Sequence, residues 1–148
     1  MKINRPKILV ATDFSDCAQR GLRVAVDLSR RLDAELTLFH AYELPVYLFP
    51  DGALLPGPEM MARMLGQISE HMDHAKQALC LEGIAAETET AQGNPVTEIV
   101  RAAEKGHFDF LVLGTHGWSG IKHALLGSVA ERVMRKAPCP VVTVRMHD

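Results

Sequence analysis

The alternation of short apolar runs with longer amphipathic stretches most restricts how this chain can fold. Residues 7–11 form a compact apolar run, and leucines and alanines then recur at helical spacing up to residue 32. Further strand-like runs span residues 35–41, 85–91, 108–113 and 141–144, and helical stretches span 59–83 and 128–136 and begin again at 95. This order predicts one α/β domain over residues 1–148, a doubly wound (Rossmann-like), five-stranded, mainly parallel sheet with helices on both faces.

Local signals mark where several elements begin. Ser15 opens the first helix, and Asn94 followed by Pro95 is typical of an N-cap and a first helical residue. Residues 42–58 contain four prolines and two glycines, which predicts no regular structure there. In the helix over 59–83 we expect the methionines to fill the core rather than form a functional surface.

Composition and charge exclude several classes of protein. Sixteen Lys and Arg residues against eighteen Asp and Glu give a net charge of −2, and the basic residues are scattered along the sequence. The sequence therefore shows no cluster of positive charge of the kind that binds a nucleic-acid backbone. Three cysteines without CxxC spacing argue against a disulfide framework or a zinc finger. The first apolar run is too short for a signal peptide, and no stretch approaches a membrane span of about 18 apolar residues. We therefore expect a cytoplasmic protein without a membrane partner.

Two loops are the natural place for a ligand. Parallel sheets bind ligands outside the carboxyl ends of their strands, where the strand order reverses. The loop after the first strand carries Thr12, Asp13 and Phe14, and the loop after the fourth strand begins at Gly114. These two loops are neighbours if the first and fourth strands pair.

The loop after the fourth strand is rich in glycine. Gly114, Gly117 and the Gly127-Ser128 pair lie before a helix start, and free N–H groups at such a start bind phosphate well. Ser128 is expected to cap this helix and to donate a hydroxyl hydrogen bond. The spacing is neither a Walker loop nor a dinucleotide fingerprint. Two interpretations stay open, a phosphate cradle or glycines that only shape turns.

The segment GTHGWSGIKHALLGSVAERVMRKAPCPVVTVR resembles the carboxyl-terminal signature of the universal stress protein family, including the glycine spacing of its ATP-binding branch. The stretches ILVATDFSD, LFHAYELP and GNPVTEIVRAAEKGHFDFLVLG are similar to that family too. The resemblance covers nearly the whole chain and is weakest over residues 42–58 and the long second helix.

The resemblance implies an ATP site with Mg²⁺ bound alongside the triphosphate. It places the phosphates on the backbone of the glycine positions, Asp13 near the ribose and phosphates, and the backbone of Ala41 against adenine. The residues expected to bind nucleotide are Ala11, Thr12, Asp13, Ala41, Gly114, Thr115, His116, Gly117, Gly127, Ser128 and Val129.

Several of these residues have a structural alternative. Asp13 could instead bond to backbone N–H groups of its own loop. His116 and His123 could touch phosphate or shuttle a proton, or lie exposed in a loop, and Lys122 could neutralise phosphate or lie on a helix surface. Trp118 could cover the loop or contact a partner subunit.

Three further features could mediate contacts. His71 and His74 are spaced for a surface metal, but a functional site needs more ligands. The segment 42–58 is unusually apolar for a connection, so it closes over the adenine or contacts a protein. Residues 141–144 predict a valine-rich edge strand, and pairing of two such edges would make a homodimer, as the resemblance also implies. The alternative is a monomer whose polar terminus protects that edge.

The chain carries no evident general base or nucleophilic triad, so we expect a nucleotide-binding regulatory protein, at most a slow ATPase. The alternative is a nucleotide-free interaction module of the same fold. A flavin carrier is disfavoured, because no Ser- and Thr-rich phosphate loop follows the first strand.

Overall fold

The structure is a computed structural model and describes residues 4–116 and 126–146. Strands and helices alternate along the chain as predicted, except where β2 is followed directly by β3 and β4. In order they are β1 (Lys7–Ala11), α1 (Asp16–Leu32), β2 (Glu35–Tyr42), β3 (Tyr47–Phe49), β4 (Gly52–Leu54), α2 (Pro58–Leu81), β5 (Ala86–Gln92), α3 (Pro95–Lys105), β6 (Phe110–Gly114), α4 (Ser128–Lys136) and β7 (Val141–Val144).

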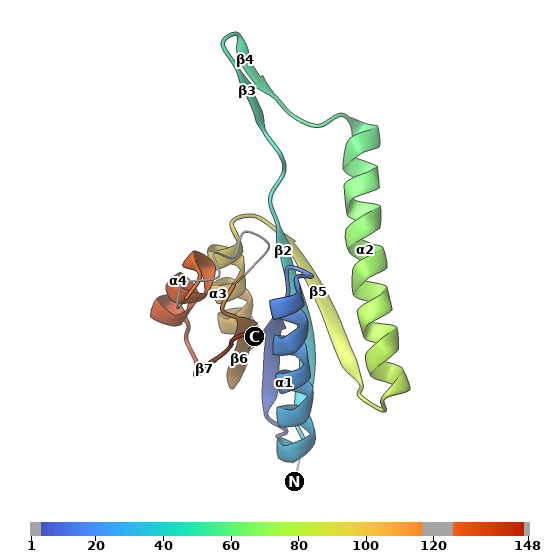
Figure 1. Cartoon of the computed structure of the whole chain (residues 1–148), viewed down its shortest axis with the longest axis vertical. Coiled ribbons are helices and arrows are strands. Elements are labelled where there is room, and N and C mark those ends of the chain that lie inside the picture. The colour runs from blue at the N-terminus through green and yellow to red at the C-terminus, as the bar shows by residue number, and fades with distance from the viewer. Residues whose placement is uncertain (1–3, 117–125, 147–148) are drawn as a thin grey trace.

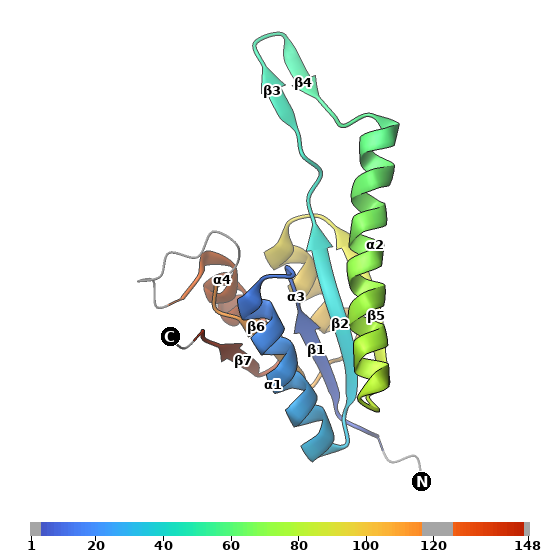
Figure 2. The same cartoon turned by 45° about the vertical axis from the view of Figure 1, so that its right-hand side comes forward.

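The main sheet has five strands in the order β5-β2-β1-β6-β7, and all of its pairings are parallel (Figures 1 and 2). After β1, the next two strands of this sheet along the chain, β2 and β5, are added on one side of β1. The chain then crosses to the other side of β1, where β6 and β7 are added. The direction of building therefore reverses between β1 and β6, which pair from Ile8 opposite Phe110 to Val10 opposite Val112. The predicted doubly wound fold is confirmed.

Helices cover both faces of the sheet. Alternate residues of β1 face opposite sides, so Ile8 and Val10 pack with α1 and α2, whereas Leu9 and Ala11 pack with α3 and α4. Two separate apolar layers result, one on each face. Strands buried on both faces are typical of parallel sheets and explain why β1 and β6 are continuously apolar in sequence.

The predicted helix starts are confirmed. Ser15 is the N-cap of α1 and accepts a hydrogen bond from the Ala18 N–H over 3.2 Å. Asn94 is the N-cap of α3, where it accepts from the Thr97 N–H, and Pro95 is the first helical residue. Each side chain satisfies one N–H group that has no partner inside its helix.

The prediction that residues 42–58 lack regular structure is wrong. Strands β3 and β4 form an antiparallel hairpin, with Tyr47 opposite Leu54 and Phe49 opposite Gly52. The prolines do not interrupt it, because Pro50 lies in the two-residue turn and Pro45 precedes β3. Pro50 is the second of the four residues of the β-turn from Phe49 to Gly52, a position at which proline is favoured.

The prediction that the methionines of α2 fill the core holds for only part of the helix. Met72 is buried against the sheet, but Met61 and Met64 are half-buried and Met60 is exposed. The first half of α2 extends beyond the end of the sheet, on the side of the molecule from which the hairpin projects (Figures 1 and 2). Helical periodicity therefore marked an apolar face correctly without indicating that half of it has no sheet to cover.

Candidate functional site

The loops after β1 and β6 begin side by side, because these two strands pair at the switch point. The Thr12 N–H donates to the Phe39 carbonyl over 2.8 Å, which extends the pairing of β1 with β2 by one residue. On the other side, the Thr115 N–H donates to the Val144 carbonyl over 2.9 Å. The predicted proximity of the two loops is therefore present.

The loop after β1 is held by its own polar side chains. The Asp13 carboxylate accepts a hydrogen bond from the Ser15 N–H, and the Thr12 hydroxyl accepts one from the Phe14 N–H, each over 3.0 Å. Phe14 has a φ of 64°, a left-handed conformation that is strained for a bulky residue. Asp13 thus makes the local backbone contact considered above, and that bond fixes its carboxylate at the switch point.

The start of α4 is anchored beside the end of β6. The Gly127 N–H donates to the Thr115 carbonyl over 2.6 Å, and a Cβ atom on Gly127 would collide with that carbonyl. Gly127 is the N-cap, so the expectation that Ser128 caps the helix is wrong. Ser128 is the first helical residue and is exposed, as is Val129.

The first turn of α4 presents donors toward the loop that precedes it. The Glu131 N–H makes the first helical bond, to the Gly127 carbonyl over 3.0 Å. The N–H groups of Ser128, Val129 and Ala130 precede it and therefore have no acceptor within the helix. Together with the positive end of the helix dipole, they suit an anion.

Gly114 has a packing role in the fold. A Cβ atom at this position would lie 2.8 Å from the Cys17 sulfur and 2.9 Å from the Cys17 carbonyl oxygen. Gly114 therefore lets α1 lie directly against the end of β6. Gly114 and Gly127 are both explained by contacts within the chain, which is the second interpretation considered for these glycines.

Small side chains lie on the α4 face of the sheet near the switch point. Ala11 of β1, Ala41 of β2 and Ala91 of β5 belong to the same apolar layer as Ala130 of α4, and Ala41 pairs with Ala91. The three alanines on the sheet leave little side-chain bulk at this point, and Ala130 faces them from α4. The predicted adenine contact at Ala41 thus lies on the same side of the sheet as the start of α4.

The remaining predicted residues divide into two groups. The Thr115 side chain is buried, and its hydroxyl lies 2.9 Å from Nδ1 of the half-buried His116. Gly117, Trp118, Lys122 and His123 lie outside the described residues. The described residues of the predicted site therefore form two neighbouring groups. One group, Ala11 to Asp13, lies at the end of β1, and the other consists of Gly114 to His116 at the end of β6 and Gly127 to Val129 at the start of α4.

A ring cluster on the opposite face was not predicted. The Phe14 ring lies between His40 and His71, with centroid distances of 4.5 Å and 4.8 Å. His40 Nδ1 donates to the Thr12 carbonyl over 2.8 Å, since a carbonyl only accepts. Burial lowers the pKa of His40, although the Thr12 carbonyl and the Asp13 carboxylate oppose that shift and His71 adds to it. His40 is therefore neutral at pH 7.

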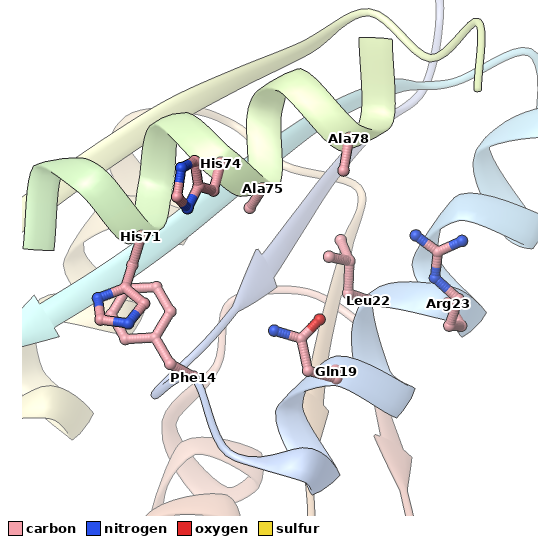
Figure 3. Close-up of a pocket in the computed structure, with 8 residues that line it drawn as sticks. All are labelled: Phe14, Gln19, Leu22, Arg23, His71, His74, Ala75 and Ala78. Carbon is pink, nitrogen blue, oxygen red and sulfur yellow. The ribbon is translucent and has the colours of Figure 1, made fainter. Parts of the chain in front are cut away.

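Beside this cluster, a cavity of about 330 Å³ opens between α1 and α2 (Figure 3). Its wall includes Phe14 and His71 at one end, Arg23 at the other, and Leu22 between them. None of the predicted nucleotide-binding residues lines it. Sequence periodicity could not reveal this cavity, because it depends on how far apart two helices lie on one face.

Comparison with known proteins gives the family. The model of the universal stress protein family matches residues 4–145. The chain belongs to the universal stress protein family. Among its relatives, Universal stress protein MJ0531 of Methanocaldococcus jannaschii is 33% identical over 141 residues, which cover 94% of this chain and 81% of that protein.

Solved structures agree with this membership. Universal stress protein UspA from Lactobacillus plantarum matches with a TM-score of 0.81 and 27% identity over 95% of this chain and 98% of that one. A universal stress protein in complex with cAMP matches with a TM-score of 0.70 and 25% identity over 94% and 96% of the two chains.

Residues 4–116 and 126–146 contain neither a membrane-spanning helix nor a clustered metal site. No helix in these ranges is long and apolar enough to cross a membrane. No three His, Cys, Asp or Glu side chains in them are grouped so as to hold a metal ion. In this universal stress protein, His71 and His74 therefore have no third ligand of these types among the described residues.

Proposed function

We propose that this universal stress protein binds ATP with Mg²⁺ at the β1–β6 switch point and acts as a nucleotide-responsive cytoplasmic homodimer in the stress response. The observation that carries the proposal is the anchoring of the α4 start, through Gly127 and Thr115, beside the loop that holds Asp13. A related structure binds the adenine nucleotide cAMP, which supports an adenine nucleotide here.

Each part of the nucleotide has a chemically suitable place. The first-turn N–H groups of α4 would receive phosphate oxygens, with no need for a lysine or arginine. The alanine face beside Ala41 would accept the adenine ring, and the backbone of Ala41 would contact its edge. Gly117, which lies outside the described residues, would let the backbone approach the phosphates closely, whereas the space beside Gly114 is filled by Cys17.

Magnesium fits this site as an ion carried by the triphosphate. Asp13 supplies the single carboxylate of the predicted set, and Mg²⁺ usually keeps phosphate oxygens and water as most of its ligands. When bound, the ion would neutralise phosphate charge. Asp13 would hold that assembly in place, since its contact with the Ser15 N–H fixes the carboxylate.

The residues favour binding over turnover. His116 is the one histidine of the predicted set, and its Nδ1 lies within hydrogen-bonding distance of the Thr115 hydroxyl. A catalytic histidine is commonly oriented by a carboxylate, whereas the one carboxylate of the predicted set, Asp13, is bonded to the Ser15 N–H of its own loop. We therefore propose a regulatory nucleotide binder whose hydrolysis, where it occurs, is slow.

The homodimer would form through β7. This strand is the outer strand of the described sheet and pairs with β6, and all four of its residues are half-buried. Antiparallel pairing of two β7 edges across a two-fold axis would satisfy the backbone groups that a sheet edge leaves open.

A second candidate is a nucleotide-free interaction module. The close contacts of Gly114 with Cys17 and of Gly127 with Thr115 favour it, because they account for both glycines without a ligand. The exposed apolar hairpin favours it as well.

One experiment separates the two candidates. Freshly purified protein is denatured, any released nucleotide is identified by chromatography and mass, and ATP is then titrated calorimetrically with and without Mg²⁺. Ser128→Pro removes an N–H at the first helical position, where proline is favoured, and the extended backbone of Gly127 (φ −72°, ψ 158°) suits a following proline.

We expect wild-type protein to bind ATP and Ser128→Pro to bind it about tenfold more weakly, because a hydrogen bond to a charged group contributes about 1.5 to 3 kcal/mol. Ser128→Ala is the matched control that removes the hydroxyl and keeps the N–H. Absence of adenine nucleotide by both routes would establish the interaction module instead.

A further inference from the structure

The hairpin and its flanks, residues 45–57, form an arm that projects from the end of β2 (Figures 1 and 2). Every residue of β3 and β4 is exposed. Leu48 is 83% exposed and Phe49 is 58% exposed, which is unusual for large apolar side chains. In both views the arm extends away from the ends of β1 and β6, so it does not cover the proposed nucleotide site.

Such an arm needs a covering surface. A two-stranded hairpin by itself is marginally stable in water, and this one is joined by only three cross-strand pairs. Its strands pack on each other, and within the described residues no other element packs extensively on them. Its ordered form therefore depends on a contact that the isolated chain does not supply.

The two faces of the hairpin differ. Directly paired residues of an antiparallel ladder share a face, so Tyr47, Leu54 and Phe49 lie on one face and Leu48 lies on the other with Ala53. Gly52, opposite Phe49, carries no side chain, which leaves one side of the Phe49 ring open. An aromatic or aliphatic side chain from another molecule fits beside that ring.

The exposed apolar surface of the arm is large for a single molecule. The arm exposes six large apolar side chains by 48% or more: Val46, Tyr47, Leu48, Phe49, Leu54 and Leu55. At about 150 to 250 Å² for an aromatic side chain, Tyr47 and Phe49 alone leave roughly 160 to 260 Å² exposed. The four aliphatic side chains add to this area, so the arm reaches the range of about 300–600 Å² that is typical of the largest, often functional, patch on a monomer.

The charge of the arm identifies the kind of partner. Residues 44–58 contain one charged side chain, Asp51. Interfaces between copies of one chain are more apolar than those between different proteins, and their cores are depleted of charge. A patch without charges also lacks the electrostatic pattern by which a surface selects a different, charged partner.

We propose that the arm is a self-association surface, which packs against the arm of a second copy of this chain with the Tyr47–Phe49–Leu54 face at its centre. This contact is separate from the proposed β7 pairing, because β7 lies at the sheet edge opposite β5 whereas the arm follows β2. It forms whether or not nucleotide is bound, and it doubles the mass of whatever species β7 pairing gives.

Sedimentation velocity over a range of protein concentrations tests the proposal. The variant Phe49→Glu with Leu54→Glu places two charges on the central face, and Leu81→Glu is the control, since Leu81 is 86% exposed at the far end of α2. We expect wild-type and control proteins to double in mass as concentration rises and the arm variant to stop at half that mass. Equal masses for all three proteins at every concentration would overturn the proposal.

Cross-linking gives a readout that does not depend on affinity. In a Cys80→Ser background, which removes the exposed cysteine, Leu54→Cys on the Tyr47–Phe49–Leu54 face of the arm is oxidised with copper phenanthroline, beside Leu81→Cys as the control. We expect a disulfide-linked dimer from the arm cysteine alone. For the sedimentation experiment, a Tm and a circular dichroism spectrum equal to those of the wild type would show that the Phe49→Glu, Leu54→Glu variant folds. A cross-link that forms equally at both positions would contradict the assignment.

Discussion

The N–H of Gly127 and the carbonyl of Thr115 lie 2.6 Å apart, and this single hydrogen bond ties the start of α4 to the end of β6. The contact is close because Gly127 has no side chain, and it positions the first-turn N–H groups of α4 at the switch point. The glycine is thus required by the fold, whatever ligand the helix start binds.

Gly127→Ala should destabilise the protein by about 1 to 3 kcal/mol, because its methyl group would collide with the Thr115 carbonyl and force the backbone apart. At this chain length that loss lowers Tm by about 2 to 4 °C per kcal/mol. Gly57→Ala is a matched control, since Gly57 is also a helix N-cap with extended backbone and has open space around it. Equal Tm losses in the two variants, measured by thermal denaturation, would show that the close contact is unimportant.

Gly114→Ala and Gly66→Ala should change stability in opposite directions. At Gly114 the added methyl group would meet the Cys17 backbone and sulfur, so α1 must shift and Tm should fall. Gly66 lies within α2 with nothing near its side-chain position, and alanine there should stabilise the protein by about 0.5 to 1 kcal/mol. Urea unfolding measures both changes, and a stabilising Gly114→Ala would refute the packing role.

Asp13→Asn should weaken ATP binding chiefly when Mg²⁺ is present. Asparagine keeps an oxygen that can accept from the Ser15 N–H, so the loop is retained while the negative charge is lost. Asp16→Asn is the control, because Asp16 is an exposed acid in the first turn of α1. Calorimetric titration should show a several-fold loss of affinity for the first variant alone, and unchanged affinity would remove Asp13 from the proposed site.

Stability should fall as the pH drops below the ordinary histidine pKa of 6.5, in part because of His40. Burial lowers the pKa of His40 in the folded state, so the unfolded chain binds the proton first and acid favours unfolding. The contribution is present above pH 6.5 and is lost as the pH falls toward the lowered value.

His40→Gln, which keeps a donor for the Thr12 carbonyl but cannot titrate, should flatten the decline in Tm between pH 7.5 and 5.5. His107→Asn is the control, since His107 is exposed after α3 and its left-handed backbone suits asparagine. A slope that persists unchanged in His40→Gln would assign the pH dependence to other groups.

Sequence patterns predicted most of the sheet because its signals are local. The apolar run at Lys7–Ala11, the Ser15 cap and the Asn94-Pro95 pair each specify nearby backbone. The hairpin was not predicted, because Pro45 and Pro50 flank β3 and do not interrupt it, so the number of prolines in the segment does not exclude a strand. In α2, the apolar spacing around Met61 and Met64 could not show that the sheet ends before them.

The candidate site was harder to predict, because its contacts join distant parts of the chain. Asp13 and Gly127 are recognisable as polar or glycine positions at element ends, and their loops do meet as expected. The close contact that requires glycine at position 127, and the placing of the Phe14 ring between His40 and His71, depend on how helices pack on the sheet. No spacing rule in one sequence encodes those distances.

Thr115 makes two backbone bonds that join the switch point to the sheet edge. Its carbonyl holds the start of α4, and its N–H holds the Val144 carbonyl, to which the Cys17 thiol also donates over 3.3 Å. One residue therefore separates the helix that would bind phosphate from the strand that would pair with a second copy. By thermodynamic reciprocity, a nucleotide that tightens subunit association must itself bind more tightly as the protein concentration rises.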